Sequence, residues 1–247
     1  MAIAFDSSNK YTACVTGTSC TYSFTNTAGD FVSNASQGYT TNPGVTSMTY
    51  GGAAMTQAGT NQHEAVGDAY SYTFYKASAA TGANNLTTTT TNSLTNGFYD
   101  HAVSYSGTHA STPVANVTQA TTGNVGNGSI AVTITTTASS WAVWSGLGSG
   151  RGRTYTAGAN TTLRSSASDG QAHTFDSGGI ANSSPWTLNA TISAGTEEKY
   201  NTAFELVVAA AASGPANLKS YNTNLTANIK SINTNLIANC KSLNTNV

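Results

Sequence analysis

Acidic residues and histidines adjoin one another at a few points of the sequence, and such pairs are the usual parts of an acid–base catalyst. Asp100 directly precedes His101, and Glu197 directly precedes Glu198. Both pairs fall in or beside segments that we expect to be strands, where neighbouring side chains point to opposite faces. No GxSxG motif accompanies the many serines to form a nucleophile elbow. We therefore predict no catalytic residues and a protein that is not an enzyme.

Metal-binding residue types are also present, at spacings that specify no site. His63, Glu64 and Asp68 lie close together, but the segment lacks the second histidine of an HExxH motif. Cys14 and Cys20 flank a turn-like stretch and form no CxxC motif, which argues against structural zinc. They could form a disulfide across a hairpin in an oxidising compartment, or stay free thiols in a reduced one. We predict no metal ion and no cofactor.

Ligand binding through aromatic faces and arginines is a further possibility that the sequence leaves open. Sugar rings stack on exposed tryptophan and tyrosine faces, and paired arginines grip carboxylates. Trp141 and Trp144 are three apart on an expected strand, so they point to opposite faces. The alternative for all these aromatic residues is plain core packing, and for the arginines a solvated loop tip. The candidate ligand-binding residues are Trp141, Trp144, Trp186, Tyr72, Arg151 and Arg153.

The composition excludes several function classes. Only 8% of the 247 residues are charged, against about 25% in an average soluble protein, and the net charge is −1. The chain therefore lacks the basic surface that nucleic-acid binding requires, and it lacks a polybasic membrane-binding segment. Threonine, which favours strands, and glycine and asparagine, which favour turns, are abundant instead.

Alternating apolar residues predict strands along most of the chain. Ile130, Val132 and Ile134 show this period of two, and similar segments recur with turn-rich gaps between them. This pattern predicts an all-β fold, an antiparallel two-sheet sandwich of jelly-roll type. The apolar content suffices for one two-sheet core, and no internal linker suggests two β-domains. The segment 25–40 is more polar than its surroundings, and we expect it to be an exposed loop or an edge.

The composition changes at Ser213-Gly214-Pro215, where an eleven-residue repeat follows. We divide the chain into a β-sandwich domain, 1–212, and an oligomerisation or docking tail, 213–247. Its apolar spacing, about 3.67 residues per helical turn, suits a hendecad coiled coil. Its many asparagines suit short stacked strands instead, and both structures stay open. Either needs partners to bury the apolar positions, which are Leu218, Tyr221, Leu225, Ile229, Ile232, Leu236, Cys240, Leu243 and Val247.

Four stretches resemble a recurrent, uncharacterised β-sandwich module of phage and uncultured-bacterial structural and surface proteins. They are 45–56, 77–90, 102–114 and 155–166, and in that module short repeats like those of the tail often follow. The resemblance implies a jelly-roll-like fold and a virion or extracellular surface location. It transfers no functional residue.

These observations predict a structural protein, part of a virion appendage, decoration or fibre, or of an extracellular filament. The N-terminal segment lacks the features of a secretory signal, and no apolar run reaches the roughly 18–20 residues of a membrane span. We expect a homo-oligomer, a trimer or a filament, without nucleic acid or membrane insertion. Other virion proteins and glycans are further possible partners. The alternative function is a glycan-binding adhesin or receptor-binding module.

Overall fold

The computed structural model describes residues 2–12, 16–39, 44–63, 69–93, 98–125, 128–148, 154–166, 172–179, 181, 184–193 and 197–210. These residues form strands, turns and loops, with no helix among them, and all strand pairs are antiparallel. Met1–Ala209 forms one unit and Ala210–Val247 a second. The predicted tail and its apolar positions lie outside the described residues. Within the described part, no helix is long and apolar enough to cross a membrane.

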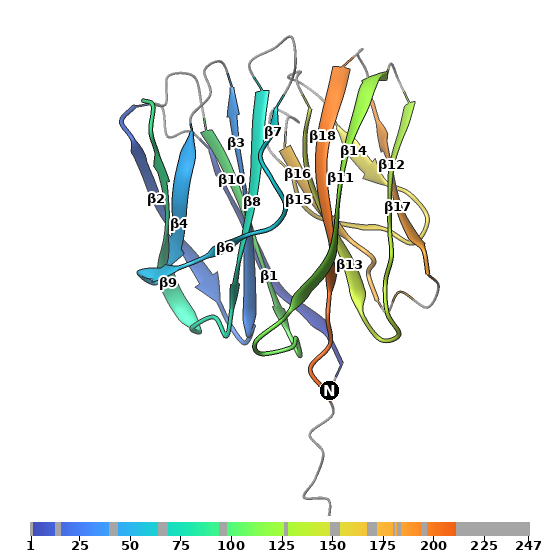
Figure 1. Ribbon diagram of the computed structural model, residues 1–247, viewed down its shortest axis with the longest axis horizontal. Helices are drawn as coiled ribbons and strands as arrows, with labels where there is room; N and C mark the ends of the chain where they lie inside the picture. Colours follow the sequence, from blue (N-terminus) through green and yellow to red (C-terminus); the bar gives the residue numbers. More distant parts are fainter. Residues whose placement is uncertain are drawn as a thin grey trace, which may run out of the picture. The chain divides into compact units, whose positions relative to one another are not determined.

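The first half of the chain forms a sandwich of two sheets (Figure 1). One sheet runs in the order β1 (Ala4–Thr12), β10 (Phe98–Ser106), β3 (Phe31–Tyr39), β8 (Ala69–Ala77) and β6 (Thr56–Gln57), with β7 (Gln62–His63) also pairing β8. The opposing sheet runs in the order β2 (Ser19–Asn26), β9 (Gly82–Thr90), β4 (Val45–Tyr50) and β5 (Ala53–Ala54).

The second half repeats this plan. One sheet runs in the order β11 (Val114–Val125), β18 (Glu197–Leu206), β13 (Trp141–Gly148), β16 (Ala172–Asp176) and β15 (Thr162–Ser166). The other has the order β12 (Gly128–Ile134), β17 (Trp186–Ile192) and β14 (Tyr155–Ala157).

The two sandwiches share one topology. In each sandwich the chain alternates between the two sheets. The last strand therefore lies between the first and the third, as β10 lies between β1 and β3, and as β18 lies between β11 and β13. This is the jelly-roll arrangement. Matching loop bonds reinforce this equivalence. The Ala79 amide donates to the Asp30 carbonyl at 2.9 Å, and the Ala181 amide donates to the Ser140 carbonyl at the same distance. The predicted fold class is confirmed, and the structure adds a second copy of the sandwich.

The four sheets stack as layers, with two inner and two outer sheets (Figure 1). One apolar core fills each sandwich, and a third lies between the inner sheets. The outer strand β2 alternates strictly between exposed and buried residues, whereas Phe31–Ser36 of the inner strand β3 are buried without interruption. Burial on both faces requires such continuous runs. The third core consists of Ile3, Phe31, Ala58, Val103, Tyr105, Trp141, Val143, Phe204 and Leu206.

Two expectations from the sequence are wrong here. The polar segment after Phe24 contains β3, a central strand of an inner sheet, rather than an exposed loop or an edge. Its small polar side chains are tolerated because they find partners inside, as in the hydrogen bond from Ser33 Oγ to the Phe74 carbonyl at 3.3 Å. The described strands on either side of residues 13–18, β1 and β2, do not pair with each other as a hairpin would, because β1 pairs with β10 while β2 pairs with β9 in the opposing sheet.

Candidate functional site

The aromatic residues predicted for ligand stacking lie inside the unit. Trp144 is fully buried and stacks on Phe175 with ring centroids 4.9 Å apart. Tyr72 is buried in the core of the first sandwich, and Trp141 meets Tyr105 edge to face at 5.9 Å between the inner sheets. Trp141 and Trp144 do face opposite sides of β13, but both sides are covered. Core packing, the alternative that the sequence left open, describes these three residues.

The remaining candidates are divided between the second core and undescribed segments. Trp186 is partly buried and packs against the core of the second sandwich. Arg151, Arg153 and Cys14 lie outside the described residues. Cys20 is disulfide-bonded. Because Cys14 lies outside the described residues, its pairing with Cys20 stays a prediction.

Metal-ligand residue types do not cluster in the described part. Glu64 and Asp68 lie outside it, so the segment around His63 is only partly described. Among the described residues, no group of three or more such side chains could hold a metal ion.

Asp100 and His101 point away from each other, as strand neighbours do. Asp100 lies in the first sandwich, where Asn34 Nδ2 donates to its Oδ1 at 3.0 Å and Ser36 Oγ donates to the same oxygen. Burial raises the pKa of Asp100 to about 6, although hydrogen bonds from Ser36, Asn34 and Thr88 act to lower it. The pair is therefore two separate buried groups and forms no acid–base dyad.

His101 faces the second sandwich. Its Nδ1 lies 2.9 Å from Ser165 Oγ on β15, and its Nε2 has no hydrogen-bond partner among the described residues. Burial, with a smaller contribution from the nearby Lys10 charge, lowers the pKa of His101 to about 3. The imidazole is therefore neutral at physiological pH.

A buried carboxylate joins the two sandwiches. Asp176 on β16 accepts from Tyr105 Oη at 2.9 Å and pairs with Arg164 Nε at 2.6 Å, both through Oδ2. The Arg164 guanidinium also lies over the Phe5 ring, 4.2 Å from its centroid. Burial, with the Asp176 charge adding to it, raises the pKa of Tyr105 well above its usual value. Residues from β1, β10, β15 and β16 thus meet around one charge.

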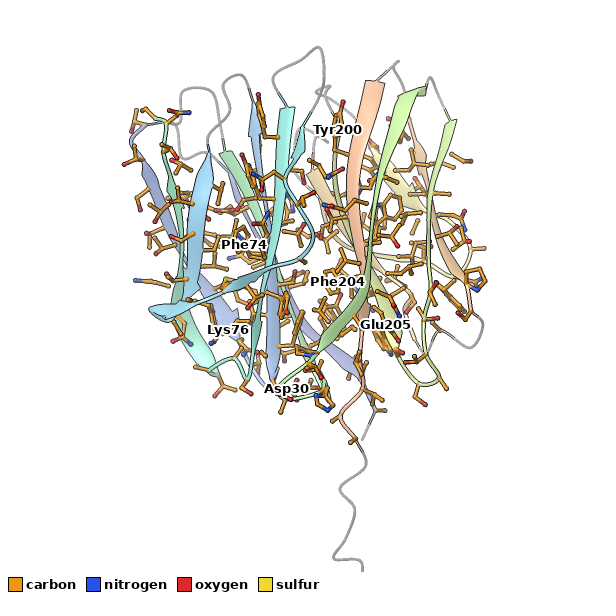
Figure 2. The ribbon with its side chains drawn as sticks, viewed as in Figure 1. Asp30, Phe74, Lys76, Tyr200, Phe204 and Glu205 are labelled. Carbon is orange, nitrogen blue, oxygen red and sulfur yellow. The ribbon has the colours of Figure 1, made fainter. Side chains whose placement is uncertain are left out.

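Glu205 on β18 anchors two other segments (Figure 2). Its Oε1 accepts from the Thr137 amide at 2.6 Å and from Ser140 Oγ at 2.5 Å, and its Oε2 accepts from Asn116 Nδ2 at 2.6 Å. Burial acts to raise the pKa of Glu205, but the hydrogen bonds from Ser140, Thr137 and Asn116 outweigh it and lower the pKa. The carboxylate ties the 137–140 turn to the bulge in β11.

Asp6 and Asp30 cap loops. Asp6 accepts from the Thr27 and Ala28 amides at 2.9 and 3.1 Å. Asp30 accepts from the Gly107 amide at 3.1 Å and from Thr108 Oγ1 at 2.7 Å. These two residues complete the set of carboxylates whose side chains the structure describes: Asp6, Asp30, Asp100, Asp176 and Glu205. Each one joins segments distant in sequence.

A groove lies where the edge strand β1 passes the edge strand β15. It has a volume of about 380 Å³ and is lined by Ser8, Asn9, Lys10, Leu163, Arg164, Ser165 and Ser166. Ser8 Oγ donates to the Arg164 carbonyl at 2.9 Å and so fixes one edge against the other. The sequence did not single out this site, because its residues come from strands about 155 positions apart and carry no motif.

These features define a protein of two jelly-roll sandwiches in tandem, braced by buried carboxylates. No family model matches the chain, and no curated protein matches it. Among solved structures, the crystal structure of the major capsid protein P2 from bacteriophage PM2 is similar, with 9% identity over 84% of this chain and 99% of that one. The TM-score of 0.27 is too low to support any transfer.

Proposed function

We propose that the chain is a non-enzymatic structural protein, a subunit of a virion appendage, decoration or fibre, or of an extracellular filament. In this proposal it self-associates partly through the tail, residues 213–247. The observation that carries the proposal is that the described carboxylates hold the fold together. Every described one, from Asp6 to Glu205, braces strands or loops, and none faces a second carboxylate across an open cleft.

The layered core supports the same proposal. Three apolar cores hold four sheets together, and the inner sheets are buried on both faces. Such a block resists deformation because closely packed interiors are nearly incompressible. The outer faces carry threonine pairs across the strands, as between Thr21 and Thr87 at 2.9 Å and between Thr133 and Thr187 at 2.9 Å. A rigid, weakly charged block suits a repeated building unit.

Sedimentation velocity of the full chain tests the proposal. A variant with Leu225→Asp and Leu236→Asp places charges on the apolar positions of the repeat. The matched control, Asn224→Asp with Asn235→Asp, adds the same charge at neighbouring polar positions. We expect the wild type and the control to sediment as oligomers and the leucine variant to sediment as a monomer. A wild type that stays monomeric at high concentration contradicts the proposal.

A further inference from the structure

We infer that the groove between β1 and β15 is a binding site for a carboxylate-bearing saccharide, such as a short chain of uronic acids. This site is distinct from the ligand-binding residues expected from the sequence. It adds recognition to the proposed structural role and does not depend on self-association.

The charge in the groove comes from one residue. Lys10 is exposed on the edge strand β1 and forms no ion pair with the described carboxylates. Arg164 also lines the groove, but its charge is largely neutralised by Asp176 at 2.6 Å. One free ammonium group among neutral polar neighbours matches a ligand with a single carboxylate per binding position.

The hydrogen bond between His101 and Ser165 leaves the Ser165 hydroxyl as a donor for a ligand in the groove. The imidazole is neutral and carries one N–H, and Nε2 is buried without a partner among the described residues. A buried N–H without an acceptor is costly, so the proton belongs on Nδ1, which donates to Ser165 Oγ at 2.9 Å. Ser165 then accepts from His101, and its own O–H is left to donate into the groove.

The rest of the lining matches a sugar better than a bare anion. Ser166 offers a neutral hydroxyl group, and Ser8 Oγ, whose proton is donated to the Arg164 carbonyl, can still accept a hydrogen bond from a sugar hydroxyl. Leu163 offers an apolar surface for the C–H face of a ring. A volume of about 380 Å³ lies within the usual range of small-molecule sites, about 300–1,000 Å³. A phosphate ion would leave most of this space and the apolar surface unused.

Calorimetric titration of the full chain with digalacturonate, neutral digalactose and inorganic phosphate tests the inference. We expect digalacturonate to bind at least about tenfold more tightly than the other two, because only it satisfies both the charge and the hydroxyls. Lys10→Gln and Ser165→Ala should each weaken digalacturonate binding by about tenfold. The control, Lys76→Gln on β8, removes the same charge away from the groove and should leave binding unchanged.

Three results would overturn the inference. They are the absence of digalacturonate binding at millimolar concentration, equal binding of phosphate, or unchanged affinity in the Lys10→Gln variant. Lys10 is exposed, so its replacement should leave the fold intact, and the melting temperature of each variant verifies this. None of these results depends on whether the chain assembles.

Discussion

Asp100 and Asn201 occupy equivalent positions in the two sandwiches. Asp100 on β10 lies opposite Ser36 on β3, and Asn201 on β18 lies opposite Gly146 on β13. Asn201 accepts a hydrogen bond from Trp144 Nε1 at 2.7 Å, so the second copy uses a neutral amide where the first uses a buried acid.

This equivalence predicts that Asp100→Asn stabilises the protein at alkaline pH. Burial raises the pKa of Asp100 from 3.8 to about 6, so its contribution to stability is fully present below pH 3.8 and is lost as the pH rises through 6. The loss amounts to about 3 kcal/mol by pH 8. The variant should therefore be about 1–3 kcal/mol more stable than the wild type at pH 8, and should lose this advantage near pH 3.5, where the wild type keeps almost all of the contribution.

Urea denaturation at the two pH values measures this difference. A variant that is less stable than the wild type at pH 8 would show that Asp100 is not a buried acid of raised pKa.

Glu205 should have the opposite pH dependence. Its hydrogen bonds lower its pKa in the folded protein, so its contribution is present above the unfolded value of 4.5 and is lost as the pH falls through the folded pKa. Glu205→Gln removes the charge from these bonds and should cost about 2 kcal/mol at pH 7. The cost should shrink on acidification, measured by thermal unfolding from pH 7 to pH 3. A constant cost across that range contradicts this role.

The ion pair between the sandwiches should stabilise the whole unit. Arg164→Met keeps the packing on Phe5 but leaves Asp176 buried without its cation, at a cost of about 3–5 kcal/mol. Tyr105→Phe removes one hydrogen bond to the same carboxylate and should cost about 1–2 kcal/mol.

A double-mutant cycle with Asp176→Asn separates the pair from the background. Chemical denaturation should give a coupling of at least about 1 kcal/mol between Arg164 and Asp176. Strictly additive losses would show that the two side chains do not interact.

Two glycines with nearly the same backbone angle should respond differently to alanine. Gly52 has φ +77° with open space around an added Cβ, so Gly52→Ala should cost only about 1 kcal/mol of backbone strain. Gly107 has φ +76°, but a Cβ there would overlap the Ala2 carbonyl oxygen. Gly107→Ala should therefore cost at least about 2 kcal/mol more, since the backbone of the first residues must move. Equal melting temperatures for the two variants would contradict the close approach of Ala2 to Gly107.

The sequence predicted the outer sheets better than the inner ones. Ile130, Val132 and Ile134 alternate because only one face of β12 is buried, and that period is visible without a structure. The inner strand β3 mixes Phe31 and Val32 with small polar residues, and its burial depends on a second sheet on its other face. Periodicity within one strand carries no information about that second sheet.

The candidate site was hidden for a related reason. Trp141 and Trp144 were expected to point to opposite faces of one strand, and both are buried because a second sandwich covers the far face of β13. The groove and the Arg164–Asp176 pair form where two copies of one fold meet. The sequence of this region shows no internal linker or obvious repeat that would reveal the duplication.

The mass in solution tests the central claim most directly. Light scattering compares the full chain with a shortened chain that ends at Ala212, which retains the unit Met1–Ala209. We predict that the full chain is a trimer or a larger assembly and that the shortened chain is a monomer. Two monomers would contradict self-association through the tail, and the chain would then act as a binding module whose tail docks onto another protein.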